Sequence, residues 1–320
     1  MVTVREQLAT PGPHFSVEFY PPRSDEEESV LWTAIRRLEV HRPAFVSVTY
    51  GAGGSRRDRT IRVTERIATQ TTLLPVAHLT AVGHTVPELR RVIGSYAAAG
   101  IHNILALRGD PPGADPLAPW EPTPGGLSHA ADLVRLARSL GAFTVGVAAY
   151  PGKHPQSPDV ATDTRFLAEK VTAGADFIIT QMLFSAADYA ALRDRAAAAG
   201  VDVPILPGIM PVTSSARLAR ICQLSGQPVP ADLADRLAAV ADDPAAGRAI
   251  GFQHAVQMCT ELLAMGAPAL HFYTFNRSKA TLDLLAALGL GAHRPIRTAR
   301  PDSSSPPGPM PVTATAPRAS

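Results

Sequence analysis

Short β-rich runs alternate along the chain with longer stretches of helical periodicity. In the clearest helical stretch, Leu89, Ile93 and Tyr96 recur at i, i+4 and i+7, which places them on one helix face, and Gly100 follows as a stop. Eight runs with strand character occupy residues 15–20, 45–50, 73–80, 103–107, 143–149, 177–183, 204–210 and 270–275. The spacing of the first six is typical of repeated strand–helix units.

Eight such units without an internal change of composition predict an α/β protein, a closed (β/α)8 TIM barrel. Parallel strands need helical crossovers, and closure leaves no exposed sheet edge. A doubly wound open sheet is the alternative. The interval 211–269 is too long for one helix and is rich in Ala and Leu, so it predicts two or three helices, with the extra helices between strands seven and eight lying outside the barrel.

The composition changes near residue 295. Seven of the thirty prolines fall in 295–320, among Ser, Thr and Ala and almost no large apolar side chains. Such a segment cannot bury enough apolar surface to fold. We therefore expect a single catalytic barrel domain at 1–294 and a disordered tail at 295–320.

Charge and cysteine content narrow the function classes. Thirty basic and twenty-eight acidic side chains nearly balance, which argues against a nucleic-acid or membrane-surface partner. The longest stretch without charged residues, 67–87, contains prolines and histidines and cannot span a bilayer, and no apolar signal segment begins the chain, so a cytoplasmic protein is expected. Cys222 and Cys259 form no CxxC motif, which predicts buried thiols and no disulfide framework.

Candidate chemistry lies at the predicted strand ends, because the active site of a (β/α)8 barrel forms at the carboxyl ends of its strands. Glu18 stands between Val17 and Phe19 at the first of these ends. A carboxyl group among apolar side chains holds its proton more tightly and can act as a general acid near neutral pH. A structural glutamate paired with lysine or arginine is an equally good interpretation at this stage.

Other polar residues at these strand ends also allow two interpretations, one structural and one functional. Arg108 and Asp110 flank Gly109, which fits either an ion pair or a ligand clamp with room for close approach of a ligand. Lys170 fits either a phosphate contact at the rim or a surface lysine. The glycine-rich turn at 51–55 is no dinucleotide fingerprint. No metal site is predicted, because His78, His154 and His271 lie on different strands without neighbouring ligands.

Taken together, these strand ends resemble the methylenetetrahydrofolate reductase family, flavoproteins of one-carbon metabolism. The resemblance covers 15–290 and rests on motifs in the family's order and spacing. They are VEFYPP at 17–22, SVTYGAGG at 47–54, HLT at 78–80, LRGD at 107–110, YP at 150–151 with HP at 154–155, ITQ at 179–181, PGIMP at 207–211 and HFYTFNR at 271–277. Each motif is weak alone, whereas eight in register are specific.

The resemblance implies an oxidoreductase acting on a CH–NH group, which reduces 5,10-methylenetetrahydrofolate to 5-methyltetrahydrofolate for methionine biosynthesis. FAD would carry the hydride, and NADH or NADPH would supply it in a ping-pong cycle. Glu18 matches the family's general acid, which protonates N10 of the folate, and Asp110 matches the aspartate that lies beside the flavin and orients the substrate. Gln181 matches a glutamine that contacts folate and nicotinamide in turn, and Arg277 matches an arginine that helps to hold folate. Thr49 and Tyr273 match nicotinamide contacts.

The positions that match the family's FAD contacts are Tyr50, Ala52, His78, Arg108, Gly109, Asp110, Ala130, Tyr150, His154, Asp163 and Lys170. Phe166 and Glu169 stand where some members have Asn and Arg, so the phosphate and ribose contacts do not carry over in detail. Ile221 stands where some members have a Phe against the folate or nicotinamide, so it keeps an apolar wall there but loses the stacking. The resemblance implies small-molecule partners, no metal, and a fold that also allows a homo-oligomer.

Two alternatives stay open beside this reading. A proline-dehydrogenase-like flavin barrel shares the architecture but does not need an acid at Glu18. A catalytically idle folate- or flavin-binding barrel has no use for a proton donor, and the presence of Glu18, Asp110 and Gln181 argues against it.

Overall fold

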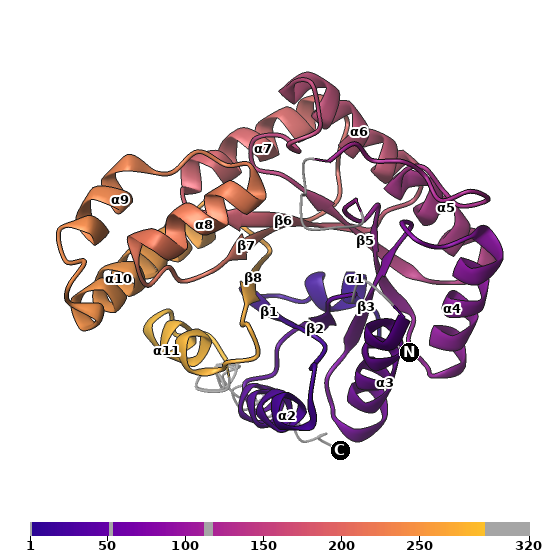
Figure 1. The fold of residues 1–320 in the computed structure, drawn as a ribbon, viewed down its shortest axis with the longest axis horizontal. Helices are drawn as coiled ribbons and strands as arrows, with labels where there is room; N and C mark the ends of the chain where they lie inside the picture. The colour runs from indigo at the N-terminus through magenta and orange to yellow at the C-terminus, as the bar shows by residue number, and fades with distance from the viewer. Residues whose placement is uncertain (1, 51–53, 112–117, 292–320) are drawn as a thin grey trace, which may run out of the picture.

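Eight parallel strands close into a barrel in which the sequence order is also the spatial order, as Figure 1 shows. The computed structural model describes residues 2–50, 54–111 and 118–291. The strands are β1 (His14–Phe19), β2 (Phe45–Val48), β3 (Pro75–Thr80), β4 (Asn103–Leu107), β5 (Thr144–Ala149), β6 (Phe177–Leu183), β7 (Ile205–Ile209) and β8 (Ala269–Tyr273). β1 pairs with β8, with Phe15 opposite Leu270, so the predicted barrel is confirmed and the open sheet is wrong.

Helices surround the barrel and connect its strands (Figure 1). They are α1 (Val4–Leu8), α2 (Asp25–Glu39), α3 (Gly54–Gln70), α4 (Val86–Ala98), α5 (Ala130–Leu140), α6 (Val160–Thr172), α7 (Ala186–Ala198), α8 (Ser215–Ser225), α9 (Ala231–Ala238), α10 (Pro244–Ala264) and α11 (Lys279–Ala287). Three of them, α8, α9 and α10, lie between β7 and β8, which confirms the predicted extra helices. They pack together on one side of the barrel.

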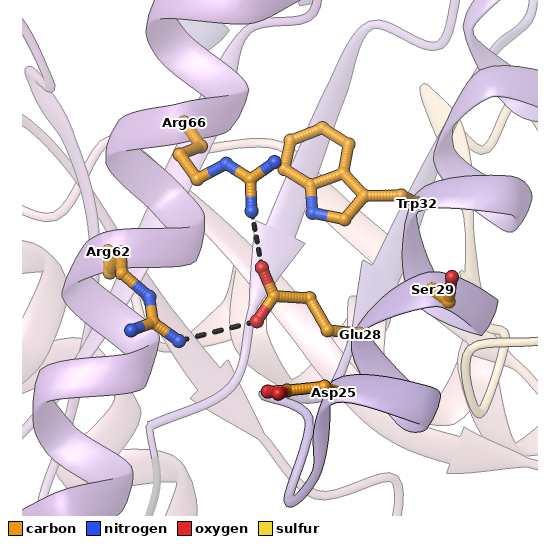
Figure 2. Close-up of a pocket in the computed structure, with 6 residues that line it drawn as sticks. All are labelled: Asp25, Glu28, Ser29, Trp32, Arg62 and Arg66. Atoms are coloured by element: carbon orange, nitrogen blue, oxygen red, sulfur yellow. Dashed lines mark hydrogen bonds and ion pairs between the residues drawn. The ribbon is translucent and has the colours of Figure 1, made fainter.

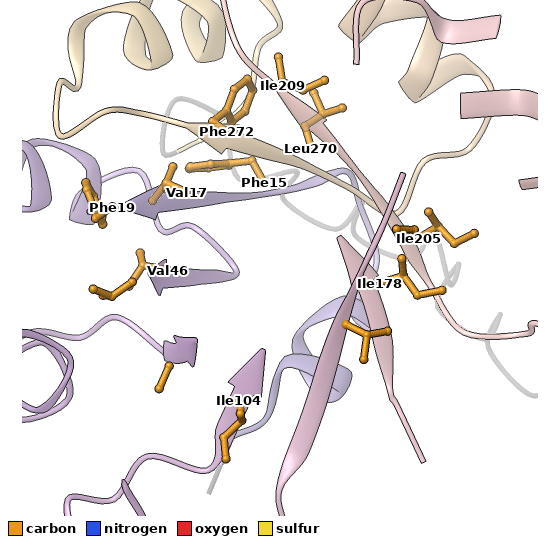
Figure 3. Close-up of a cluster of buried hydrophobic side chains, with 14 of the residues drawn as sticks. Phe15, Val17, Phe19, Val46, Ile104, Ile178, Ile205, Ile209, Leu270 and Phe272 are labelled. Carbon is orange, nitrogen blue, oxygen red and sulfur yellow. The ribbon is translucent and has the colours of Figure 1, made fainter. Parts of the chain in front are cut away.

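The alternation of side chains along each strand separates the helix-facing core from the barrel interior. Phe15, Val17 and Phe19 of β1 are buried in one large apolar cluster with residues of the surrounding helices (Figure 3). Ser16 and Glu18 occupy the intervening positions and therefore face the interior. On the other strands, too, every second side chain points into the barrel interior.

The interior is apolar at the amino end of the barrel. Phe45, Phe177 and Leu206 cluster there with Val4 of α1, which closes this end. The Val4 amide donates to Asn103 Oδ1 at 3.1 Å and fixes α1 in place. Sequence reasoning missed α1, because a five-residue helix with one buried side chain has no readable periodicity. The polar interior positions are thereby left to the carboxyl end.

The end of β8 differs from the predicted run 270–275. The strand ends at Tyr273, because Phe275 and Asn276 adopt positive φ angles of 49° and 58° that no strand allows. The Asn276 side chain bonds the Tyr20 backbone at 2.8 and 2.9 Å and ties this turn to the end of β1. The turn therefore brings two carboxyl strand ends together.

The predictions about the cysteines, membrane-spanning helices and the C-terminal tail can be compared with the structure one by one. Cys222 and Cys259 are buried and free, as predicted, and burial raises the pKa of the Cys259 thiol to about 12. In the described ranges, no helix has the length and apolar character needed to cross a membrane. The predicted tail at 295–320 and the predicted FAD contact Ala52 lie outside the described residues.

Candidate functional site

The carboxyl end of the barrel opens into a cavity of about 1350 Å³, larger than a typical site for one drug-sized ligand. Side chains from β1 to β6 and β8 and from the loops and helices after them line it. The sequence-predicted site residues that the structure brings together on its walls are Glu18, Thr49, Tyr50, His78, Arg108, Gly109, Asp110, Ala130, Tyr150, His154, Asp163, Lys170, Gln181 and Tyr273. Arg277 is exposed and does not line the cavity.

Glu18 lies on the cavity wall near the end of β1 with only 4% of its surface exposed. Its Oε2 lies 3.4 Å from the Ser47 hydroxyl, from His78 Nε2 and from His271 Nε2, which β2, β3 and β8 contribute. Within the described part of the chain, no lysine or arginine forms an ion pair with it. The structural alternative of a Lys–Glu or Arg–Glu pair is therefore wrong.

The two imidazoles beside Glu18 have different surroundings. Burial lowers the pKa of His78 to about 4, so this ring is neutral at pH 7 and does not balance a charge on Glu18. Its Nε2 is buried without a hydrogen bond of good geometry among the described residues. The other ring nitrogen of His271, Nδ1, lies 2.8 Å from the Ser16 hydroxyl, and this hydrogen bond fixes the orientation of the ring. One carboxyl oxygen of this nearly fully buried side chain thus meets three polar groups.

The LRGD motif forms the wall at the end of β4, but not as an Arg–Asp ion pair. The Arg108 guanidinium lies 5.0 Å from the Trp120 ring centre, and its Nε donates to the Gly109 carbonyl at 3.2 Å. Asp110 is exposed to the cavity. Gly109 adopts φ +87°, and a Cβ there would lie 2.3 Å from the Val82 side chain, so neighbouring protein rather than a ligand demands the glycine.

The wall built by α6 carries a half-buried lysine, Lys170. Lys170 Nζ donates to the Ala148 carbonyl of β5 at 2.6 Å, and burial lowers the pKa of Lys170 to about 8, with Asp163 opposing the shift. Asp163 accepts from the Ser157 hydroxyl at 2.6 Å and from the His154 amide at 3.1 Å. Lys170 therefore belongs to the cavity, and the alternative of a surface lysine is wrong.

An arginine that sequence reasoning missed fixes the loop after β5. Arg195 of α7 donates through one nitrogen to the carbonyl oxygens of Tyr150, Pro151 and Gly152, at 3.1 and 2.9 Å for the first and last. The loop so fastened carries Tyr150 and His154 on the cavity wall. No sequence signal distinguishes Arg195 from the other charged residues of its helix.

The ends of β6 and β8 meet across the cavity floor. The Tyr273 hydroxyl donates to the Thr180 carbonyl at 2.8 Å, which leaves its ring on the wall. The Gln181 side chain accepts from the Met182 amide at 3.0 Å. Burial raises the pKa of Tyr150 to about 12, and a hydrogen bond with Gln181 opposes that shift. Tyr273 thus lies on β8, the strand paired with β1 beside Glu18, while Tyr150 and Gln181 come from the ends of β5 and β6.

A second hollow lies on the outer surface between α2 and α3 (Figure 2). Glu28 forms ion pairs with Arg62 at 3.3 Å and with Arg66, and the Arg66 guanidinium lies 4.4 Å from the Trp32 ring centre. Glu28 and Asp25, which also lines the hollow, together balance the charges of the two arginines, and the hollow is open to solvent. The cavity at the barrel end is therefore the candidate site.

Three aromatic residues on the cavity wall were not predicted as part of the site, namely Tyr20, Trp120 and Phe166. Trp120 follows the long connection after β4, where neither periodicity nor a motif indicates side-chain direction. The described residues contain no cluster of three or more His, Cys, Asp or Glu that could hold a metal ion. Polar donors, aromatic rings and the half-buried Lys170 and Arg108 are therefore what the site offers a ligand.

Fold and cavity together define a (β/α)8-barrel protein with its ligand site at the carboxyl ends of the strands. A family model described as methylenetetrahydrofolate reductase matches residues 3–289, and the chain belongs to this family. It is 38% identical to the 5,10-methylenetetrahydrofolate reductase of Escherichia coli strain K12 over 276 residues, which is 86% of this chain and 90% of that protein.

More distant relatives agree with this membership. The chain is 34% identical to methylenetetrahydrofolate reductase (NADH) 1 of Arabidopsis thaliana, over 86% of this chain and 48% of that protein. Among solved structures, a Clostridium thermocellum protein described as binding two copies of 5-methyl-5,6,7,8-tetrahydrofolic acid has a TM-score of 0.60 at 12% identity. The match covers 90% of this chain and 98% of that one, and it shows the shared fold alone.

Proposed function

We propose that this protein reduces 5,10-methylenetetrahydrofolate to 5-methyltetrahydrofolate, with FAD as hydride carrier and NADH or NADPH as hydride donor. The observation that carries the proposal is the buried Glu18 carboxyl, which faces the cavity with no lysine or arginine paired to it among the described residues. A binding protein needs no such group, whereas opening of the folate's five-membered ring needs a proton at N10. Family membership supports the same reaction.

The residues present fit a flavin dinucleotide. The cavity of about 1350 Å³ holds a half-buried lysine, Lys170, with an arginine, Arg108, on the neighbouring wall, and such groups suit a pyrophosphate. Tyr50 and Tyr150 supply flat, partly apolar walls of the kind that suit an isoalloxazine ring. When bound, FAD supplies two-electron hydride chemistry that no side chain provides.

In this proposal Glu18 holds the transferable proton, and Ser47 and His271 orient its Oε2. Protonation of N10 breaks the bond from that nitrogen to the methylene carbon and leaves an iminium at N5, which accepts a hydride to become the methyl group. Gln181 and Tyr273 also line the cavity, where folate and nicotinamide would bind in turn. Asp110 would orient the pterin, and Arg277 would act from outside the cavity lining.

The test is an absorbance spectrum of the purified protein with FAD, followed by anaerobic NADH or NADPH and then methylenetetrahydrofolate. A flavin band that bleaches with nucleotide and returns with folate would support both half-reactions and their ping-pong order. A protein that binds flavin but never bleaches would contradict the reductase proposal and favour the idle barrel. A protein that binds no flavin yet turns over folate would contradict the carrier role of FAD.

FAD affinity is expected to fall as pH rises above 8, because Lys170 loses its proton there. Its pKa is about 8 in the free protein, and a bound pyrophosphate would raise it, so protonation and binding favour each other. Neither His154, whose pKa lies below its ordinary value of 6.5, nor Tyr150, with a pKa of about 12, titrates between pH 8 and 9.5. The dissociation constant should rise by up to about tenfold per pH unit in this window.

Quenching of FAD fluorescence between pH 6.5 and 9.5 measures this dependence. Lys170→Met should bind more weakly and give a flat profile across the window. Lys153→Met is the control, because Lys153 donates to the Ser157 carbonyl at 2.6 Å and does not line the cavity, so its profile should match wild type. If the FAD affinity of the wild type does not change above pH 8, the assignment of Lys170 to the phosphate site is wrong.

A further inference from the structure

Strand β6 has an irregularity next to the cavity. Between two regular pairs of the β6–β7 ladder, Thr180 and Gln181 of β6 stand opposite the single residue Pro207 of β7. This is the arrangement of a β-bulge, which is rare between parallel strands and is over-represented beside active sites. Proline has no amide hydrogen, so β7 lacks one ladder donor at this point. The sequence of β7 therefore gives a local reason for the irregularity in β6.

The bulge changes which side chains of β6 reach the cavity. Before it, Ile178 belongs to the helix-facing core and Ile179 to the interior cluster. After it, Met182 lines the cavity and Leu183 belongs to the helix-facing core. An unbroken alternation from Ile179 would have turned Met182 towards the helices. The bulge thus gives the cavity two consecutive side chains, Gln181 and Met182.

The Thr180 hydroxyl holds the bulge together. Thr180 is 0% exposed, and its Oγ1 accepts from the Gly208 amide and donates to the Gln181 carbonyl, both at 2.8 Å. The Thr180 carbonyl accepts from the Tyr273 hydroxyl at 2.8 Å. A Cβ at residue 208 would lie 2.5 Å from this carbonyl oxygen, so β7 packs directly against the bulge. One buried threonine therefore ties β6 to both β7 and β8.

The bulge backbone in turn fixes the Gln181 side chain. The Met182 amide donates to Gln181 Oε1 at 3.0 Å, so the oxygen end of the side chain is held against the strand. The amide nitrogen is a donor only and is the end left to serve other partners. Gln181 also shares a hydrogen bond with Tyr150, which lines the cavity. The direction of the Gln181 amide therefore depends on where the bulge places the Met182 backbone.

We propose that Thr180 is a positioning residue for Gln181. Its hydroxyl holds the bulge, and the bulge holds the Gln181 amide in the orientation that binds folate and nicotinamide. This role rests on the proposed function, in which both ligands bind against Gln181. The Thr180 hydroxyl acts only through Gln181, because it is buried and both of its hydrogen bonds lie within the sheet. Without it, the Gly208 amide and the Gln181 carbonyl lose their partner and the bulge rearranges.

The test follows the two half-reactions of Thr180→Val by anaerobic stopped-flow spectroscopy. Valine keeps the branched shape and removes the hydroxyl. The half-saturation concentrations for the nicotinamide nucleotide and for methylenetetrahydrofolate should each rise roughly tenfold, the equivalent of one lost hydrogen bond. The limiting rates and the FAD dissociation constant should stay near wild type, because ligand binding and not proton or hydride transfer is affected. Thr180→Ser retains the hydroxyl and should restore wild-type values.

A double-mutant cycle separates positioning from general destabilisation. Gln181→Leu alone should raise the same two half-saturation concentrations, and Thr180→Val added to it should raise them no further. Thr180→Ala is a second variant without the hydroxyl that cannot crowd the bulge, and it should match Thr180→Val.

Thr64→Val is the matched control. Thr64 is also 0% exposed, and its hydroxyl donates to the Thr60 carbonyl at 2.8 Å, but it lies on α3 and does not line the cavity. This variant loses a buried hydroxyl as Thr180→Val does, and it should keep both half-saturation concentrations.

The outcomes distinguish this role from the proposed function. Wild-type half-saturation concentrations in both Thr180→Val and Thr180→Ala would overturn the positioning role while the reductase activity of the wild type stood. A further increase in the double variant over Gln181→Leu, or an equal increase in Thr64→Val, would overturn it as well. A wild-type protein that performs neither half-reaction would overturn it together with the proposed function. An increase that serine reverses and that Gln181→Leu abolishes supports it.

Discussion

Glu18→Gln is expected to lose folate reduction by a factor of about 10² to 10⁴ while it still binds FAD and accepts hydride from NADH or NADPH. Glutamine has nearly the same shape and can still bond Ser47 and His271, so the cavity wall keeps its form. An amide cannot deliver a proton to N10 of the folate. The two half-reactions should therefore separate in this variant.

Anaerobic stopped-flow spectroscopy measures the two half-reactions individually. Bleaching of the flavin by nucleotide should keep its wild-type rate, and the return of colour with methylenetetrahydrofolate should slow. Glu65→Gln serves as the control, since it makes the same chemical change on the exposed surface of α3, and it should behave as wild type in both steps. Unimpaired folate turnover by Glu18→Gln would show that another group supplies the proton.

Much of the fold and part of the site could be predicted from the sequence, because both depend on short-range patterns. Alternation along the first strand puts Val17 and Phe19 on one face and Glu18 on the other, and a parallel barrel brings all carboxyl strand ends to one place. The cavity wall that unites Glu18, His78 and Gln181 follows from those two facts. The cofactor and substrate roles of these residues stay predictions until the experiments above.

What could not be predicted depends on contacts between distant segments. The three groups around Glu18 Oε2 come from three different strands, and only their register sets the 3.4 Å distances. Arg195 fastens a loop some forty residues earlier in the chain, at Tyr150, through carbonyl oxygens that every residue possesses. Trp120 and Phe166 face the cavity because of how a loop and a helix pack, which no local pattern records.

The division of the barrel interior explains why the site tolerates so many polar groups. The amino end is filled by apolar side chains and closed by Val4 of α1, which keeps water away from Asn103 and its neighbours. The carboxyl end can then hold Glu18, His78 and His271 in buried positions without loss of the core beneath them. The apolar side chains that stabilise the barrel interior thus lie at the amino ends of the strands, and the polar side chains of the candidate site lie at the carboxyl ends.

Gly251→Ala is expected to destabilise the protein by about 2 kcal/mol or more, because α10 approaches the loop after β7 too closely for a side chain. A Cβ at residue 251 would lie 1.6 Å from the Val212 carbonyl oxygen, and this backbone atom cannot rotate away. Alanine in a helix interior normally gains about 1 kcal/mol over glycine, so the overlap must exceed that gain. Val212 is itself buried in the cluster beneath α8, and the helix would have to move.

Gly94→Ala is the matched variant, since Gly94 lies inside α4 with nothing within 4 Å of an added Cβ. It should stabilise the protein by about 0.5 to 1 kcal/mol through helix propensity alone. Urea unfolding of both variants and wild type measures the two free-energy changes with opposite expected signs. A Gly251→Ala protein as stable as wild type would contradict the close contact between α10 and Val212.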